Sequence, residues 1–71
     1  MNITLQQTEK LLKGNLAISQ ISFSMMVTLL KSRYAKAPTQ ETLKGCTDEI
    51  NVFLGKYGSI MGNDVENITK L

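Results

Sequence analysis

The longest uncharged stretch of the chain constrains its fold more than any other feature. It spans residues 14–30, reads GNLAISQISFSMMVTLL and lies between Lys13 and Lys31. A membrane-spanning helix needs about 20 mostly apolar residues, with a lower limit of roughly 17. This stretch is barely that long, contains Asn, Gln, Ser and Thr, and has no Trp or Tyr at its edges to form an aromatic belt. We therefore expect no membrane span here.

On a helical wheel, this stretch presents two apolar stripes instead of one. At about 100° per residue, the side chains separate into two sets. The first stripe is Ile18, Ile21, Met25 and Leu29, and the second is Leu16, Phe23, Met26, Val27 and Leu30. Small polar residues lie between them, and Gln20, Ser24 and Thr28 form a separate polar ridge. An apolar surface this wide predicts a helix that is covered from two sides.

The start and the continuity of this helix follow from local signals. Thr4 opens a capping-box pattern, which predicts a helix start. Gly14 is a possible stop signal. Leu12 and Leu16 nevertheless stay in phase across it, which favours continuity. A period-two alternation after Gln20 favours a strand locally but is short. The pattern predicts one long helix from about residue 4 to about residue 34, kinked at Gly14.

A second helix is predicted after a proline. Pro38 disfavours the α conformation at the residue before it, so a break is expected at about residues 35–39. Thr39 is a good N-cap for a helix over about residues 40–57. Apolar residues recur in that helix at spacings of three and four, as in a coiled coil. They are Leu43, Cys46, Ile50, Phe53 and Tyr57.

These elements predict an all-α fold, an antiparallel helical hairpin with a long first helix and a shorter second one. Short connections favour antiparallel neighbours. We expect one domain over residues 1–71, with Asp64 capping a short turn or helix at about residues 64–71. The second helix can cover only one stripe of the first, and the pattern leaves open which one. A core this small is marginal, so we expect dimerisation or a partner to cover the other stripe.

No residue pattern indicates catalysis, a metal site or a cofactor. The chain has no His and a single Cys, whereas a tetrahedral zinc site takes four ligands. Cys46 is expected in the core, where a free Cys is commonly found. Asp48 and Glu49 point about 100° apart on a helix, so a solvated surface is expected there. The lone Cys and the absence of a signal-peptide pattern favour a cytoplasmic protein. A chain this short, without an activated pair of side chains, is not expected to be an enzyme.

A basic cluster supports an alternative function. Lys31, Arg33 and Lys36 surround Tyr34 near the end of the first predicted helix. Cations with an aromatic residue are a weak signal for nucleic acid, and a homodimeric bundle that binds it is our alternative interpretation. The net charge of +2 is modest, and cations also favour a helix C-terminus without any ligand. A small membrane-active protein is a third interpretation.

One stretch resembles a known family. In a chain of this length, MMVTLLKSRYAKAPTQETLKGCTDEINVFLGKY, residues 25–57, resembles the small co-chaperone of bacterial type III secretion needles. The likeness is one of length and pattern: a long first helix, a short break and an amphipathic second helix. The resemblance implies a cytoplasmic protein that pairs with a helical chaperone and helps to keep the needle subunit unpolymerised. It implies no catalytic residue.

The favoured function is therefore a non-enzymatic protein–protein interaction module, and the resemblance implies that the module is such a co-chaperone. It would bury an apolar helix face against the helices of a partner or of a second copy. The expected contact residues are Ile18, Ile21, Phe23, Met25, Met26 and Leu29. We expect a charge placed at Ile21 or Met25 to weaken association more than a charge at Ser24 or Thr28.

Overall fold

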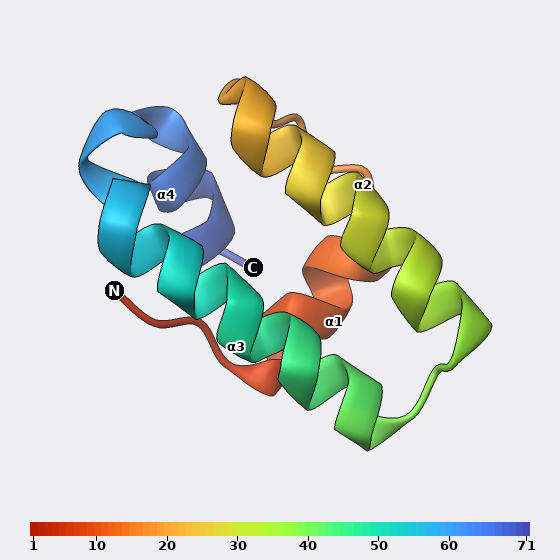
Figure 1. Ribbon diagram of the computed structural model, residues 1–71. Helices are drawn as coiled ribbons and strands as arrows, with labels where there is room; N and C mark the ends of the chain where they lie inside the picture. Colours follow the sequence, from red (N-terminus) through yellow and green to blue (C-terminus); the bar gives the residue numbers. More distant parts are fainter.

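The computed structural model describes residues 1–71 and contains four α-helices, one short 3₁₀ turn and no β-strand (Figure 1). The elements in chain order are α1 (Leu5–Lys13), α2 (Ile21–Lys36), α3 (Gln40–Tyr57), the turn η1 (Gly58–Ile60) and α4 (Asn63–Thr69). The all-α class is confirmed. None of the helices combines the length and the apolarity that crossing a bilayer requires.

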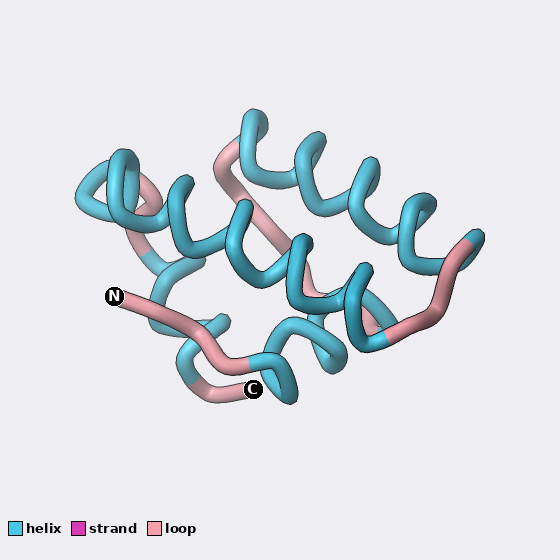
Figure 2. The backbone as a smooth tube through the Cα atoms, turned by 60° about the horizontal axis from the view of Figure 1, so that its bottom comes forward, coloured by secondary structure: helices cyan, strands magenta, loops and turns pink.

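The helices pack together with α1 in contact with each of the other three. In both Figure 1 and Figure 2, α2 and α3 lie side by side, run in opposite directions and are joined by a short connection. Helix α1 packs against α2, α3 and α4, and η1 packs back on α3. The predicted two-helix hairpin is therefore incomplete, because α1 and α4 are separate helices that contribute to the same core.

The prediction of one long first helix is wrong. Helix α1 ends at Lys13, and residues 14–20 form the loop that Figure 2 shows between α1 and α2. Gly14 is extended, with φ −97° and ψ −172°, and its N–H donates to the Lys10 carbonyl. Beyond it, Leu16 and Ile18 are partly buried against the core while Ala17 is exposed, the alternation of an extended chain. Leu12 and Leu16 are spaced as on one face of a helix, but the chain between them is not a continuous helix.

Residues 14–20 are held in place by a buried carboxylate from α4. Asp64 is 1% exposed, and its two oxygens accept the Ser19 and Gln20 backbone N–H groups at 2.9 and 2.8 Å. The prediction that Asp64 caps the last helix is wrong, because α4 begins at Asn63. Gly62 precedes that helix with a φ of +55°, a conformation that suits glycine. Asp64 thus fastens a distant loop instead of its own helix.

The second predicted helix matches the structure closely. Helix α3 has the predicted bounds, and the break covers residues 37–39, slightly less than expected. The Thr39 hydroxyl accepts the Thr42 N–H at 3.1 Å, as an N-cap does. The capping box at Thr4 is also present, since Gln7 and Thr4 bond each other's backbone N–H through their side chains.

The core is a single cluster of thirteen buried apolar side chains drawn from α1, α2, α3, α4 and the segments around them. From α3 it takes Leu43, Cys46, Ile50 and Leu54. The N-terminal segment is tied to α3, because Asn51 accepts the Ile3 N–H and donates to the Ile3 carbonyl. Every buried polar side-chain atom has a hydrogen-bond partner. The core is therefore complete within one chain.

Candidate interaction surface

Helix α2 has one apolar face in the core and another in solvent. Phe23, Val27 and Leu30 are 0%, 3% and 1% exposed. On the other side of the helix, Ile21, Met25 and Leu29 are 74%, 64% and 68% exposed. We call these three residues the α2 outer stripe. Their i, i+4, i+8 spacing places them on one side of the helix. The question that the sequence left open is thereby answered: the stripe containing Phe23 packs inward.

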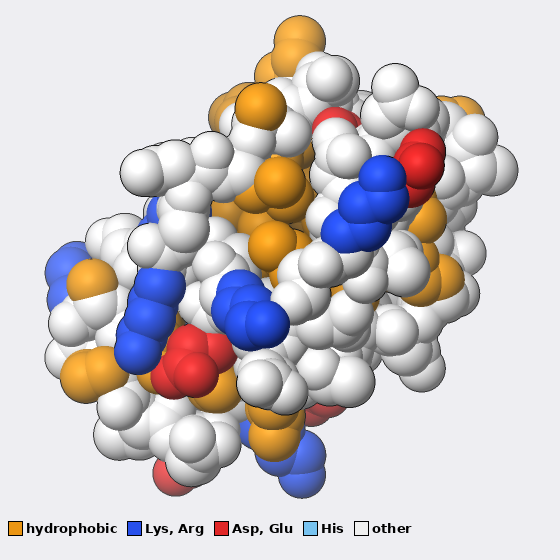
Figure 3. All heavy atoms as spheres, turned by 180° about the vertical axis from the view of Figure 1, so that it is seen from behind, with side chains coloured by type: hydrophobic (Ala, Val, Ile, Leu, Met, Phe, Trp, Pro, Cys, Tyr) orange, Lys and Arg blue, Asp and Glu red, His pale blue; other side chains and the backbone are white.

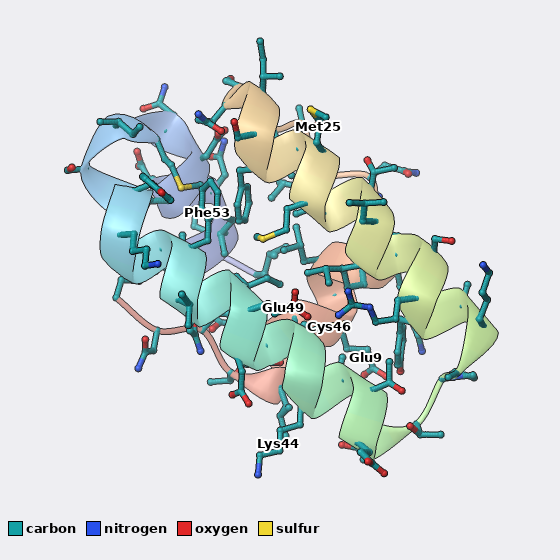
Figure 4. All side chains as sticks on the ribbon, viewed as in Figure 1. Glu9, Met25, Lys44, Cys46, Glu49 and Phe53 are labelled. Atoms are coloured by element: carbon teal, nitrogen blue, oxygen red, sulfur yellow. The ribbon has the colours of Figure 1, made fainter.

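The six predicted contact residues fall into two groups. Ile21, Met25 and Leu29 form the α2 outer stripe, and Figure 4 shows Met25 on the side of α2 away from α3. The other three belong to the folded interior. Phe23 is fully buried, Met26 is partly buried against the core, and Ile18 lies before α2 in the extended loop. Only the residues of the first group are mostly exposed.

A shallow hollow lies along the α2 outer stripe. Its volume is about 300 Å³, and it is lined by Ser24, Met25, Thr28 and Leu29. The Thr28 hydroxyl donates to the Ser24 backbone carbonyl, so it is already paired within the helix. Ser24 and Thr28 thus belong to the same surface as the stripe. A charge at Ser24 or Thr28 would therefore be introduced into the same surface as a charge at Met25. The structure gives no reason for the predicted difference between these positions, so a control substitution has to be made elsewhere.

A second apolar area lies between α2 and α3. We call it the α2–α3 groove; its volume is about 380 Å³, and it is lined by Met26, Asp48, Glu49, Val52, Phe53, Lys56 and Tyr57. The Phe53 ring lies 5.3 Å from that of Phe23 and 4.9 Å from that of Tyr57, centroid to centroid. Figure 4 shows Phe53 directed from α3 toward α2. Phe53 and Tyr57 were expected in a coiled-coil seam, but Tyr57 is 45% exposed.

This groove was not predicted from the sequence. Phe53 and Tyr57 were expected to face a long first helix, whereas α2 begins only at Ile21. At this end of the molecule the two rings also line a neighbouring hollow of about 320 Å³, together with Ile60 of η1. Viewed from behind in Figure 3, hydrophobic atoms also protrude at the upper edge, where α2 begins in Figure 1. Exposed apolar side chains are thus concentrated around the start of α2 and the end of α3.

Cys46 lies in the core, as predicted, and is fully buried. Burial raises the pKa of its thiol above the ordinary value. The Glu49 carboxylate acts in the same direction, and the Arg33 guanidinium acts against it. A thiol with a raised pKa stays protonated at neutral pH and is a poor nucleophile. No group of three or more His, Cys, Asp and Glu side chains is placed to hold a metal ion.

The basic residues of α2 do not form one patch. Lys31 donates to the Gly14 carbonyl at 2.9 Å, whereas Arg33 forms an ion pair with Glu49 of α3. The intervening aromatic residue is not available for stacking, because Tyr34 is 8% exposed and its hydroxyl donates to Glu9. On the face shown in Figure 3, Lys and Arg side chains are scattered, some beside acidic ones. Nothing in this arrangement favours nucleic acid as the ligand.

Comparison with known proteins identifies no relative: no protein-family model, curated protein or solved structure matches this chain. What the protein does has to be inferred from its own surfaces. The two that stand out are the α2 outer stripe and the α2–α3 groove with the charges at its rim.

Proposed function

We propose that this protein is a non-enzymatic interaction module whose α2 outer stripe binds a helix of another protein. One observation supports the proposal above all. Ile21, Met25 and Leu29 remain about two-thirds exposed although the opposite face of the same helix already closes the core. Apolar anchors at i, i+4 and i+8 are what helix-in-groove and helix-on-helix recognition uses.

The energy available from this stripe is appreciable. Burying an aliphatic or Met side chain completely contributes about 1.5–3 kcal/mol. Scaled by the exposed fractions of the three residues, the stripe would contribute roughly 3–6 kcal/mol when a partner covers it. The chain cannot gain this energy on folding, because the three side chains point away from its core. The energy is gained when a partner helix with its own apolar stripe covers them.

The charges on α2 indicate which partner helix would fit. Helix α2 has no acidic residue, and Lys36 is exposed at its C-terminal end, just beyond the stripe. Acidic residues beside the apolar ones of a partner helix would therefore pair with Lys36 and fix the direction in which that helix lies on α2. The needle subunit of a type III secretion system, implied by the resemblance of residues 25–57, is one helical candidate. The first helix here is shorter than that resemblance implies.

The proposal is tested by substituting the stripe. A photo-crosslinking amino acid at Met25, introduced in the cell of origin, identifies the protein that covers the stripe. Its affinity for the purified chain is then measured by calorimetry. Met25→Asp should weaken binding about tenfold, because it removes an apolar contact worth about 1–2 kcal/mol and places a charge in the interface.

The matched control is Leu5→Asp. Leu5 is another exposed hydrophobic residue, but it lies at the start of α1, where a carboxylate suits the helix dipole. Its substitution should leave the affinity unchanged. If both substitutions weaken binding equally, or if Met25→Asp has no effect, the α2 outer stripe is not the binding surface.

A further inference from the structure

The outer face of α3 carries a second regular stripe, of a different kind. Asp48, Val52 and Lys56 follow one another at i, i+4 and i+8, and all three line the α2–α3 groove. Val52 is 57% exposed, and both charged side chains are exposed. We call these residues the α3 outer stripe. It has an acid at one end, an apolar residue in the middle and a base at the other end.

Neither charge of this stripe is used within the chain. The structure has three ion pairs, Lys13–Glu9, Arg33–Glu49 and Lys70–Glu66. Asp48 and Lys56 take part in none of them. Lys44, which precedes Asp48 by four residues, forms no ion pair with it and points away from the body of the molecule in Figure 4. The acid and the base of the α3 outer stripe are therefore both free to pair with another molecule.

We propose that a second copy of this chain binds here, with its α3 antiparallel to the α3 of the first and a two-fold axis at Val52. Under that symmetry, residue i meets residue j and residue j meets residue i. Val52 then packs on Val52 of the second copy, and Asp48 of each copy faces Lys56 of the other. The stripe is thus complementary in charge to itself, but only in the antiparallel orientation.

Two glycines on α3 fit the same arrangement. Gly45 and Gly55 lie seven residues before and three residues after Val52, spacings that keep them on its side of the helix. A Cβ atom at either position would have no neighbour within 4 Å, so nothing inside the chain requires glycine there. Glycine weakens a helix relative to alanine. On this face it would let a second helix approach closely.

The strength of the association follows from the area involved. A stable complex covers about 800 Å² on each partner. Val52 alone falls short of that, and the adjoining groove with its partly exposed Phe53 and Tyr57 rings has to be covered as well. We therefore expect a weak dimer whose formation depends on the concentration. The surface lies on α3, so this proposal is independent of the function proposed for α2.

Charge reversal tests the pairing directly. Sedimentation equilibrium of the wild-type chain from micromolar to millimolar concentration should show a monomer–dimer equilibrium. Asp48→Lys makes both pairs of the interface Lys–Lys, and Lys56→Asp makes both Asp–Asp. Each single substitution should weaken the dimer about tenfold or more. The double variant Asp48→Lys/Lys56→Asp should restore it, and so should an equimolar mixture of the two single variants.

Controls separate this surface from others. Both positions are exposed, so circular dichroism should show unchanged helix content in every variant. Met25→Asp, on the α2 outer stripe, should leave the dimer unaffected. The proposal is overturned if the wild-type chain stays monomeric at millimolar concentration, or if charge reversal does not change the dimerisation constant. It is equally overturned if the mixed single variants associate no better than either does alone.

Discussion

The most informative single substitution is at Asp64, whose carboxylate joins α4 to the loop between α1 and α2. Its oxygens accept the N–H groups of Ser19 and Gln20, which lie 45 and 44 residues earlier in the chain. These two residues end the loop between α1 and α2, and Gln20 is the N-cap of α2. If the carboxylate is removed, the loop before α2 loses its hydrogen bonds to α4.

The size of the effect can be worked out from the two hydrogen bonds. A hydrogen bond to a charged group contributes about 1.5–3 kcal/mol net, so Asp64→Ala should lose roughly 3–6 kcal/mol. A 71-residue domain has a total stability of about 4–11 kcal/mol at the usual value per residue. Alanine could therefore unfold the protein. Asp64→Asn keeps one acceptor oxygen but turns an NH2 group toward the other N–H, so it should cost at least one of the two bonds, roughly 1.5–3 kcal/mol or more.

The assay is urea unfolding followed by circular dichroism, with Asp48→Asn as the matched control. Asp48 is exposed and has no ion-pair partner, so the same substitution there should change stability by less than about 0.5 kcal/mol. At concentrations where the chain is monomeric, the difference between the two variants isolates the buried carboxylate. Thermal unfolding should show a drop of at least about 6 °C for Asp64→Asn.

Amide hydrogen exchange locates the effect. In the wild-type chain the Ser19 and Gln20 N–H groups should be protected, and in Asp64→Asn they should exchange much faster, since local opening no longer breaks bonds to a carboxylate. Amides in the middle of α3 should change only in proportion to the global stability. If Asp64→Asn is no less stable than Asp48→Asn, the carboxylate does not anchor the loop and the reasoning is refuted.

Two further predictions concern pH and glycine. Burial raises the pKa values of Tyr34 and Cys46 above their ordinary values of 10.0 and 9.0, so both side chains lose their protons at a lower pH in the unfolded chain than in the folded one. The contribution of these two groups to the free energy of unfolding is therefore complete below about pH 9. It is lost as the pH rises through the folded pKa values. Urea midpoints should therefore fall at alkaline pH, and less steeply in Tyr34→Phe; a flat profile would contradict this. Gly45→Ala should stabilise the chain by up to about 1 kcal/mol, because its Cβ meets open space. Gly14→Ala should destabilise it, because its Cβ would lie 2.9 Å from the Lys10 carbonyl oxygen, and equal signs in urea unfolding would refute this steric argument.

The parts of the fold that could be predicted are those fixed by neighbours in sequence. Helix α3 follows from Pro38, the Thr39 cap and a regular apolar spacing, all within one segment. The two faces of α2 follow from a period that the helix itself imposes. In both helices the residues that make up the sequence pattern also form the helix, so the prediction did not depend on any contact with a distant part of the chain.

The parts that could not be predicted depend on distant contacts. Gly14 did carry a stop signal, but the extended path after it is stabilised by Asp64, which no local pattern connects to Ser19. The α3 outer stripe was missed for a related reason. Asp48 was weighed as an acid beside Glu49, and only the fold shows that Glu49 pairs with Arg33 while Asp48 stays unpaired on the outer face.

Together, the two proposed surfaces explain how individually weak contacts could give stable binding to a partner. The α2 outer stripe offers roughly 3–6 kcal/mol per copy, whereas association costs an estimated 4–15 kcal/mol in lost freedom. One stripe alone is therefore expected to bind a partner weakly. A two-fold dimer through α3 would present two such stripes, one on each copy, because Met25 lies on the side of α2 away from α3. A partner with two suitable helices would then be bound at both, and the second contact would form at a high effective concentration.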